Sequence, residues 1–236
     1  MTLLRRALNK NKVLTLTFDN PKKLNAWTLP LLSQLFDALQ QAATDDQVKA
    51  VVVSGAGKYY SAGVDLPSLL KPMAPFRLVR QLRDQNQLCF KTWLDFPKPI
   101  VAAVNGPAIG AAVTSSVLAD AIVASERATF SLPFAKLGVP PEGCSSVTWP
   151  ERMGEAAAQR MLGPENWTPP AAEATAAGLL GEVVPLVGDG ADLDASNAAV
   201  VARAIEVAEA AVAAGRQRRY APGELDKLQR VNAEES

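Results

Sequence analysis

A single carboxylate, Glu142, has surroundings that could support acid–base chemistry. It lies in residues 139–146 (VPPEGCSS), between two prolines that restrict the backbone and small residues that leave space around the side chain. The chain contains no histidine, so proton transfer near neutral pH must fall to another side chain. A poorly solvated carboxylate has a raised pKa and can act as a base toward a carbon-bound proton. The residues alone favour a second interpretation, in which Glu142 caps a helix that begins at residues 145–146.

Two loops rich in small residues could bind negative charge. Residues 60–66 (YSAGVDL) and 105–111 (NGPAIGA) each lie between a predicted buried strand and a predicted helix start. Backbone N–H groups at a helix N-terminus lack intrahelical partners and attract anions. Two such groups directed at one oxygen form an oxyanion hole, although each loop taken alone is better explained as a packing turn.

Three other stretches suggest phosphate binding at first sight. Residues 54–58 (SGAGK) are not a P-loop, because a tyrosine follows the lysine where Ser or Thr is required, and a second tyrosine replaces the last glycine of a dinucleotide fingerprint. Lys22 and Lys23 are explained equally well as an exposed turn or as phosphate contacts. For residues 215–219 (GRQRR) we favour a solvated helix end over contact with a phosphate-bearing ligand.

The composition disfavours several classes of function. With no histidine and only Cys89 and Cys144, we expect no metal site and no disulfide framework. Lysine plus arginine and aspartate plus glutamate both number 24, so the excess positive charge typical of nucleic-acid or membrane-surface binding is missing. No apolar run approaches the ~20 residues of a membrane span, and the N-terminus lacks the apolar core of a signal peptide. We therefore expect an intracellular protein with no nucleic-acid or membrane partner.

The elements that must position these residues alternate between strands and helices. Alternating or β-branched apolar runs predict strands at residues 13–18, 49–54, 99–104, 119–124, 128–131 and 182–185. Helical spacing predicts helices at residues 28–43, 66–94 with a break near 71–75, 109–118, 155–161 and 170–177. This alternation indicates an α/β fold with parallel strands and helical crossovers.

After residue 188 the pattern is helical only. Ser196 can cap a long alanine-rich helix that Gly215 would end. We therefore divide the chain into a core of residues 1–188 and a C-terminal helical region of residues 189–236.

Several of these stretches together resemble the crotonase (enoyl-CoA hydratase/isomerase) superfamily. Residues 51–66 resemble its first signature, and residues 98–111, followed by Ala119 and Asp120, resemble its second. Within the superfamily, residues 129–146 look most like the peroxisomal-type Δ3,Δ2-enoyl-CoA isomerases. The resemblance covers roughly residues 13–185.

The resemblance implies a crotonase-type spiral of ββα repeats whose C-terminal helical region builds a homotrimer. It implies a bent acyl-CoA substrate, with the thioester oxygen in an oxyanion hole formed by the N–H groups of Val64 and Ala111. No cofactor is implied beyond the CoA of the substrate. The implied substrate contacts are Lys22, Lys23, Leu24, Ala26, Ala62, Gly63, Asp65, Leu66 and Gly110. The chain ends soon after Asn232, which is earlier than the resemblance leads us to expect for the last helix.

The resemblance also implies the reaction. Hydratases of the family use two glutamates, whereas the matching positions here hold Thr114 and Phe134, which cannot move a proton. Glu142 stands where the isomerase branch has its single catalytic glutamate. The implied activity is conversion of 3-enoyl-CoA to trans-2-enoyl-CoA in the β-oxidation of unsaturated fatty acids, in a peroxisome or the cytoplasm. The alternatives are a dienoyl-CoA isomerase, thioesterase or hydratase of this superfamily, or a non-catalytic acyl-CoA-binding scaffold.

Overall fold

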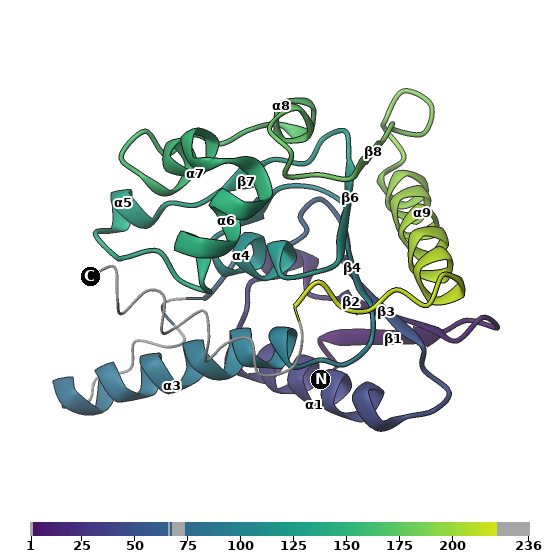
Figure 1. The fold of residues 1–236 in the computed structure, drawn as a ribbon, viewed down its shortest axis with the longest axis horizontal. Coiled ribbons are helices and arrows are strands. Elements are labelled where there is room, and N and C mark those ends of the chain that lie inside the picture. The colour runs from purple at the N-terminus through teal and green to yellow at the C-terminus, as the bar shows by residue number, and fades with distance from the viewer. Residues whose placement is uncertain (1, 66, 68–73, 221–236) are drawn as a thin grey trace.

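The computed structural model describes residues 2–65, 67 and 74–220 of the 236-residue chain (Figure 1). Three features of the sequence lie outside these residues: Leu66, most of the predicted helix break, and the C-terminal stretch that contains Asn232. Within them, the chain forms one six-stranded sheet with helices on both faces.

The six strands of the main sheet follow one another in the spatial order β1-β2-β3-β4-β6-β8. They are β1 (Leu4–Leu8), β2 (Val13–Phe18), β3 (Ala50–Gly55), β4 (Ile100–Val104), β6 (Ala121–Ser125) and β8 (Glu182–Val184). β1 pairs antiparallel with β2, and every other pair of neighbours is parallel. The predicted α/β fold with parallel strands is thus confirmed. β5 (Ala108–Ile109) and β7 (Phe130–Ser131) form a separate parallel pair.

The helices of the described residues connect and cover these strands. They are the 3-10 helix η1 (Pro21–Lys23), α1 (Leu29–Thr44), α3 (Pro75–Leu94), α4 (Ala111–Val117), α5 (Phe134–Leu137), α6 (Ser145–Met153), α7 (Glu155–Leu162), α8 (Ala171–Ala176) and α9 (Leu193–Ala213). None of these described helices is long and apolar enough to cross a membrane.

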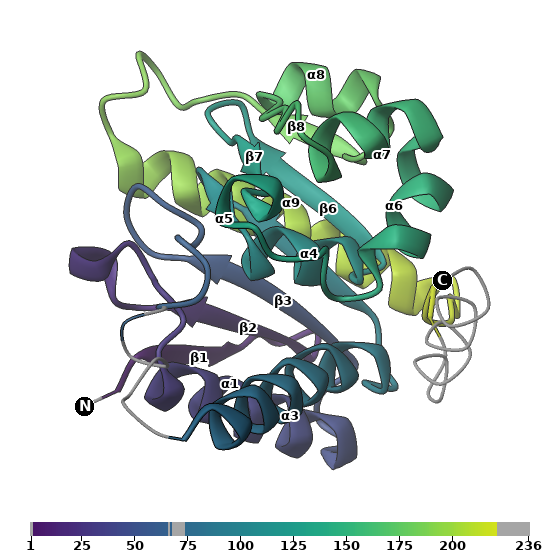
Figure 2. The same cartoon turned by 90° about the vertical axis from the view of Figure 1, so that its left-hand side faces the viewer.

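Two hydrophobic cores form because the strands are apolar on both faces, as buried parallel strands are. In β3, Val51 and Val53 face one core, whereas Ala50 and Val52 face the other. The first core is covered by α1, α3, α4 and α6, and the second by α9, the yellow helix of Figure 1. In the view turned by 90° in Figure 2, α9 runs behind the strands. Since α9 packs on the sheet, the first helix after residue 188 shares a core with the strands, and the division into two regions stays a prediction.

The ends of α9 correct one prediction and confirm another. Asp192, not Ser196, is the N-cap, because an oxygen of its side chain accepts a hydrogen bond of 2.9 Å from the Ala195 N–H. Ser196 instead accepts from the Val187 N–H at 3.2 Å, so the predicted cap was four residues too late. Gly215 follows the last turn with a φ of 61°, as a helix-ending glycine does.

Candidate active site

The two loops predicted from the sequence lie against each other beyond the carboxyl ends of β3 and β4. The Ile109 N–H donates to the Ser61 carbonyl at 3.0 Å, and the Tyr60 N–H donates to the Pro107 carbonyl at 3.1 Å. Gly63 lies at the closest approach, with a φ of +76°. A Cβ at this position would lie 2.4 Å from the Ile109 carbonyl oxygen, so only glycine allows the loops to meet.

Val64 and Ala111 each offer an unpaired backbone N–H at this meeting point. A Cβ on Gly63, next to Val64, would lie 3.8 Å from the Ala111 nitrogen. Val64 and Trp27 form an isolated β-bridge, in which the Trp27 N–H donates to the Gly63 carbonyl and the Asp65 N–H donates to the Trp27 carbonyl. The Val64 N–H takes no part in these bonds. Ala111 is the first residue of α4, where N–H groups lack intrahelical acceptors. Neither N–H donates to another residue that the structure describes.

Two buried asparagines hold residues 55–59, the segment that leads into the first loop. The Asn25 amide donates to the carbonyls of Ala56 and Tyr59, at 2.9 and 2.8 Å. The Asn105 side chain accepts from the Gly55 N–H and donates to the Gly57 carbonyl, both at 3.0 Å. The role of Asn25 could not be predicted from local sequence, because its acceptors are more than 30 residues away along the chain.

The predicted CoA contacts near residue 24 are brought beside the first loop. The Ala62 N–H donates to the Leu24 carbonyl at 2.9 Å, so the segment with Leu24 and Ala26 runs along the segment with Ala62 and Gly63. Leu24 is left-handed, with a φ of 52°, and its side chain is exposed.

The other predicted contacts flank this segment and the two loops. Lys22 and Lys23 lie in η1, and both are exposed. Asp65 is half-buried at the end of the described first loop, and Gly110, with a φ of 57°, precedes Ala111.

Glu142 lies half-buried in the segment between α5 and α6, where α6 packs against α4. Its Oε2 accepts a hydrogen bond of 2.5 Å from the Asn86 amide of α3. The alternative role as a helix cap is wrong, because the N-cap of α6 is Cys144 and the Glu142 side chain bonds Asn86 instead. Only the Glu142 backbone carbonyl contacts the helix start, at 3.2 Å from the Ser145 nitrogen.

The surroundings of Glu142 disfavour its charged form. Burial raises the pKa of Glu142, and the hydrogen bond from Asn86 opposes that shift. Two further residues of α3 lie near this segment, Phe90 against Gly143 and Cys89 close enough to feel the charge of Glu142. A Cβ on Gly143 would lie 2.6 Å from the ring of Phe90, and the pKa of the buried Cys89 thiol is raised by burial and by the charge of Glu142. The carboxylate is therefore held in a setting that favours proton uptake.

The two positions that match the hydratase glutamates are buried and carry no acid. Thr114 lies within α4, and its hydroxyl donates to the Ala111 carbonyl at 3.2 Å. Phe134 begins α5 and is 5% exposed. No group of three or more His, Cys, Asp or Glu side chains that could hold a metal occurs in the described part of the chain.

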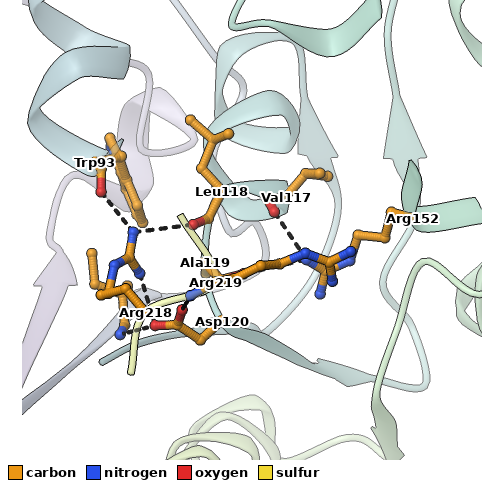
Figure 3. A network of polar contacts seen from close by, with 9 residues as sticks. Trp93, Val117, Leu118, Ala119, Asp120, Arg152, Arg218 and Arg219 are labelled. Atoms are coloured by element: carbon orange, nitrogen blue, oxygen red, sulfur yellow. Dashed lines mark hydrogen bonds and ion pairs between the residues drawn. The ribbon is translucent and has the colours of Figure 1, made fainter. Parts of the chain in front are cut away.

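In the basic cluster at residues 215–219, residues 215–217 and 219 are exposed as predicted, but Arg218 is not. The side chain of Arg218 is only 3% exposed and forms an ion pair of 2.8 Å with Asp120 (Figure 3). The Arg219 N–H donates to the same carboxylate at 2.6 Å. The prediction of a solvated helix end was therefore wrong for Arg218, because the half-buried carboxylate of Asp120, far away in the sequence, binds it.

Comparisons with known proteins place the chain in a family. Residues 9–235 match the family model described as enoyl-CoA hydratase/isomerase, and the chain belongs to this family. The superfamily that the sequence motifs suggested is thereby confirmed. An enoyl-CoA hydratase/isomerase from Pseudoalteromonas atlantica T6c has the same fold, with 30% identity, a TM-score of 0.74, and coverage of 98% of this chain and 82% of that chain.

Two curated relatives are named as isomerases. The chain is 43% identical over 175 residues to enoyl-CoA delta isomerase 2 of Rattus norvegicus, and the matched stretch covers 72% of this chain and 43% of the relative. It is 40% identical over 182 residues to the peroxisomal enoyl-CoA delta isomerase 3 of Mus musculus, and the matched stretch covers 75% of this chain and 56% of the relative. The chain thus spans about half the length of these relatives.

Proposed function

We propose that the chain is an enoyl-CoA isomerase that converts 3-enoyl-CoA to trans-2-enoyl-CoA in the breakdown of unsaturated fatty acids. The observation that carries the proposal is the state of Glu142, a half-buried carboxylate with a raised pKa that Asn86 holds in one orientation. The absence of an acid at Thr114 and Phe134 argues against hydration by a glutamate pair. The names of the rat and mouse relatives support the same reaction.

In the proposed mechanism, Glu142 takes one proton from C2 of the 3-enoyl thioester. The electron pair of the C–H bond forms a C1–C2 double bond, and the carbonyl electrons move to the thioester oxygen, which gives a dienolate. Glu142 then returns the proton to C4, where the electron pair of the C3–C4 double bond forms the new C–H bond. The C1–C2 pair moves to form the C2–C3 double bond, and an oxygen lone pair re-forms the carbonyl. The reaction is balanced without water or an oxidant, so one carboxyl group suffices.

The N–H groups of Val64 and Ala111 are proposed to stabilise the dienolate oxygen. They are unpaired among the described residues, and the approach of the loops at Gly63 brings them together. Donors of this kind act strongly because they are already oriented before the charge develops, and removal of one typically costs ~10²–10³ in kcat.

Asn86 is proposed to keep Glu142 both oriented and ionised. Burial alone favours the protonated form, which cannot accept a proton from C2. The amide donates to the charged carboxylate and offsets part of that effect. A carboxylate with a moderately raised pKa combines basicity with a sufficient ionised fraction near neutral pH.

The CoA part of the substrate is proposed to lie along the segment that flanks the first loop. The exposed Lys22 and Lys23 would face the phosphates, and Leu24 and Ala26 would contact the adenine. The thioester would then contact residues of the two loops, namely Ala62, Gly63, Asp65 and Gly110, together with Leu66, which lies outside the described residues. The lysines would act mainly on KM, since they are remote from the reacting carbons.

Assembly and location are part of the proposal. We propose a homotrimer in which the region after residue 189 takes part, and a peroxisomal location. The support is the superfamily resemblance and the word peroxisomal in the name of the mouse relative. Light scattering of the full chain tests the trimer, and fractionation of the source cells tests the location.

The experiment that tests the function follows trans-3-hexenoyl-CoA by the ultraviolet absorbance of the conjugated thioester. An isomerase produces a stable rise in absorbance, and mass spectrometry shows a product of unchanged mass. A hydratase would give a product heavier by one water. If the protein binds CoA esters without turnover, the proposal is wrong and a scaffold role becomes the better account.

A further inference from the structure

The short helix α4 is buried along its whole length, and two arginines from distant segments bind its C-terminal end. Each residue of Ala111–Val117 is buried. The last carbonyls of a helix have no intrahelical donors, and a buried helix end needs other partners. In α4 these partners are the guanidinium groups of Arg152 and Arg218 (Figure 3).

Arg152 reaches this end from α6. Its Nη1 donates to the carbonyls of Val117 at 2.9 Å and Ala119 at 3.2 Å, and its Nε donates to the Leu179 carbonyl at 3.2 Å. Burial, with a smaller effect of the neighbouring Arg219, lowers the pKa of Arg152 to about 10. Arg152 is therefore still charged at neutral pH, and its charge faces the negative end of the α4 dipole.

Arg218 approaches from the other side, after the end of α9 (Figure 3). Its Nη2 donates to the Trp93 carbonyl at 2.7 Å and to the Leu118 carbonyl at 3.3 Å, while Nη1 pairs with Asp120 at 2.8 Å. Asp120 also accepts from the Ile100 N–H at 2.8 Å, at the start of β4. The end of α4 is thus tied to α3, to the sheet and to the segment after α9.

The opposite end of α4 supplies the N–H of Ala111. A helix rises about 1.5 Å per residue, so the arginines bind roughly 10 Å from that N–H. A helix of two turns has few hydrogen bonds of its own and does not hold its orientation without external contacts. A small tilt of α4 would move the Ala111 N–H relative to the thioester oxygen.

We propose that Arg152 and Arg218 are positioning residues for the oxyanion hole. They fix the C-terminal end of α4 and thereby the direction of the Ala111 N–H, without touching the substrate. The inference rests on the proposed function, in which this N–H binds the thioester oxygen.

Lys98 provides a matched control. Its ammonium group donates to the Ala42 carbonyl at 2.6 Å and to the Asp45 carbonyl at 2.8 Å, so it binds the C-terminal end of α1. Helix α1 supplies no N–H group to the proposed site. Loss of Lys98 therefore removes the same kind of contact from a helix that the reaction does not use.

The test compares Arg152→Met and Arg218→Lys with Lys98→Met, each assayed at least about 10 °C below its own midpoint of thermal unfolding. Misplacement of a catalytic group by about 1 Å can cost ~10²-fold in rate, so we expect the arginine variants to lower kcat by about 10- to 100-fold with little change in KM. Lys98→Met should lower the unfolding midpoint and leave kcat within about twofold. Equal kcat values for the folded arginine variants and Lys98→Met would overturn the proposal. If Arg152→Met does not fold, Arg218→Lys decides alone.

A second readout separates this inference from the proposed function. The amide resonance of Ala111, recorded by NMR without substrate, should shift more in Arg218→Lys than in Lys98→Met. That comparison needs no turnover. An inactive wild type would therefore refute the proposed isomerase activity, while the Ala111 resonance would still test whether the arginines position α4. An unchanged Ala111 resonance in both arginine variants would overturn the positioning role even if the wild type is active.

Discussion

Asn86→Ala is expected to raise the pKa of Glu142 further and to move the acidic limb of the pH–rate profile to higher pH. In the folded protein the Asn86 amide donates a 2.5 Å hydrogen bond to the carboxylate and opposes the effect of burial. Hydrogen bonds to charged groups contribute about 1.5–3 kcal/mol. Because water would enter the space left by the amide, we expect loss of the bond to disfavour the charged carboxylate by an amount near the lower end of this range.

The assay is kcat/KM for trans-3-hexenoyl-CoA as a function of pH, for the wild type, Asn86→Ala and the control Gln87→Ala. Gln87 is the next residue of α3 and is exposed, so its removal changes the helix without touching Glu142. The control should reproduce the wild-type profile. An acidic limb that stays in place in Asn86→Ala, or moves to lower pH, would refute the reasoning.

The same variant has a predicted effect on stability. The folded-state pKa of Glu142 is above its unfolded value, so the folded state binds more protons between these two values. Stability therefore falls as pH rises through this window. Since Asn86→Ala raises the folded-state pKa further, it should destabilise the protein more at pH 7 than at about pH 4, where Glu142 is largely protonated in both states.

Three further predictions concern the loops, the base and the buried ion pair. Gly63→Ala should lower kcat by ~10²–10³, because a Cβ there would lie 2.4 Å from the Ile109 carbonyl oxygen. The control Gly188→Ala, at a φ of +63° with open space around it, should affect only thermal stability. Equal kcat values for the two variants would contradict the role of Gly63. Glu142→Gln should raise the midpoint of urea unfolding at pH 7 and not at about pH 4, because it removes a desolvated charge; a gain that is equal at both pH values would argue against burial as the cause. Asp120→Ala should cost about 3–5 kcal/mol in urea unfolding, since it leaves the Arg218 charge buried without its partner, and a loss below about 1 kcal/mol would refute the ion pair's role.

The parallel sheet could be predicted from the sequence because its signal is local. Runs such as residues 50–55 are short, apolar and β-branched, and they alternate with amphipathic helices. Helix α5 was not predicted, and only the start of α6 was, in the interpretation of Glu142 as a helix cap. One is a single turn, and the other contains Pro150 and follows a left-handed Cys144, so neither shows an uninterrupted helical pattern.

The parts of the site were predictable to different extents. The two loops were, because small residues between a strand and a helix mark a close approach of the backbone. Asn86 was not, since it is 56 residues away from Glu142 along the chain, in a polar stretch of a long helix. Arg218 was assigned to solvent for the same reason, because its partner Asp120 lies 98 residues away. Such pairings depend on how α3 and the segment after α9 pack, which local patterns do not determine.

The central claim is that Glu142 moves the proton while the two loop N–H groups hold the thioester oxygen. The most direct test compares the turnover of trans-3-hexenoyl-CoA by the wild type, Glu142→Gln and the control Glu165→Gln, an exposed carboxylate paired with Arg160. We predict that the wild type and the control isomerise the substrate at similar rates, and that Glu142→Gln binds it but loses activity by several orders of magnitude. Turnover that survives in Glu142→Gln would contradict the account and place the proton transfer on another group.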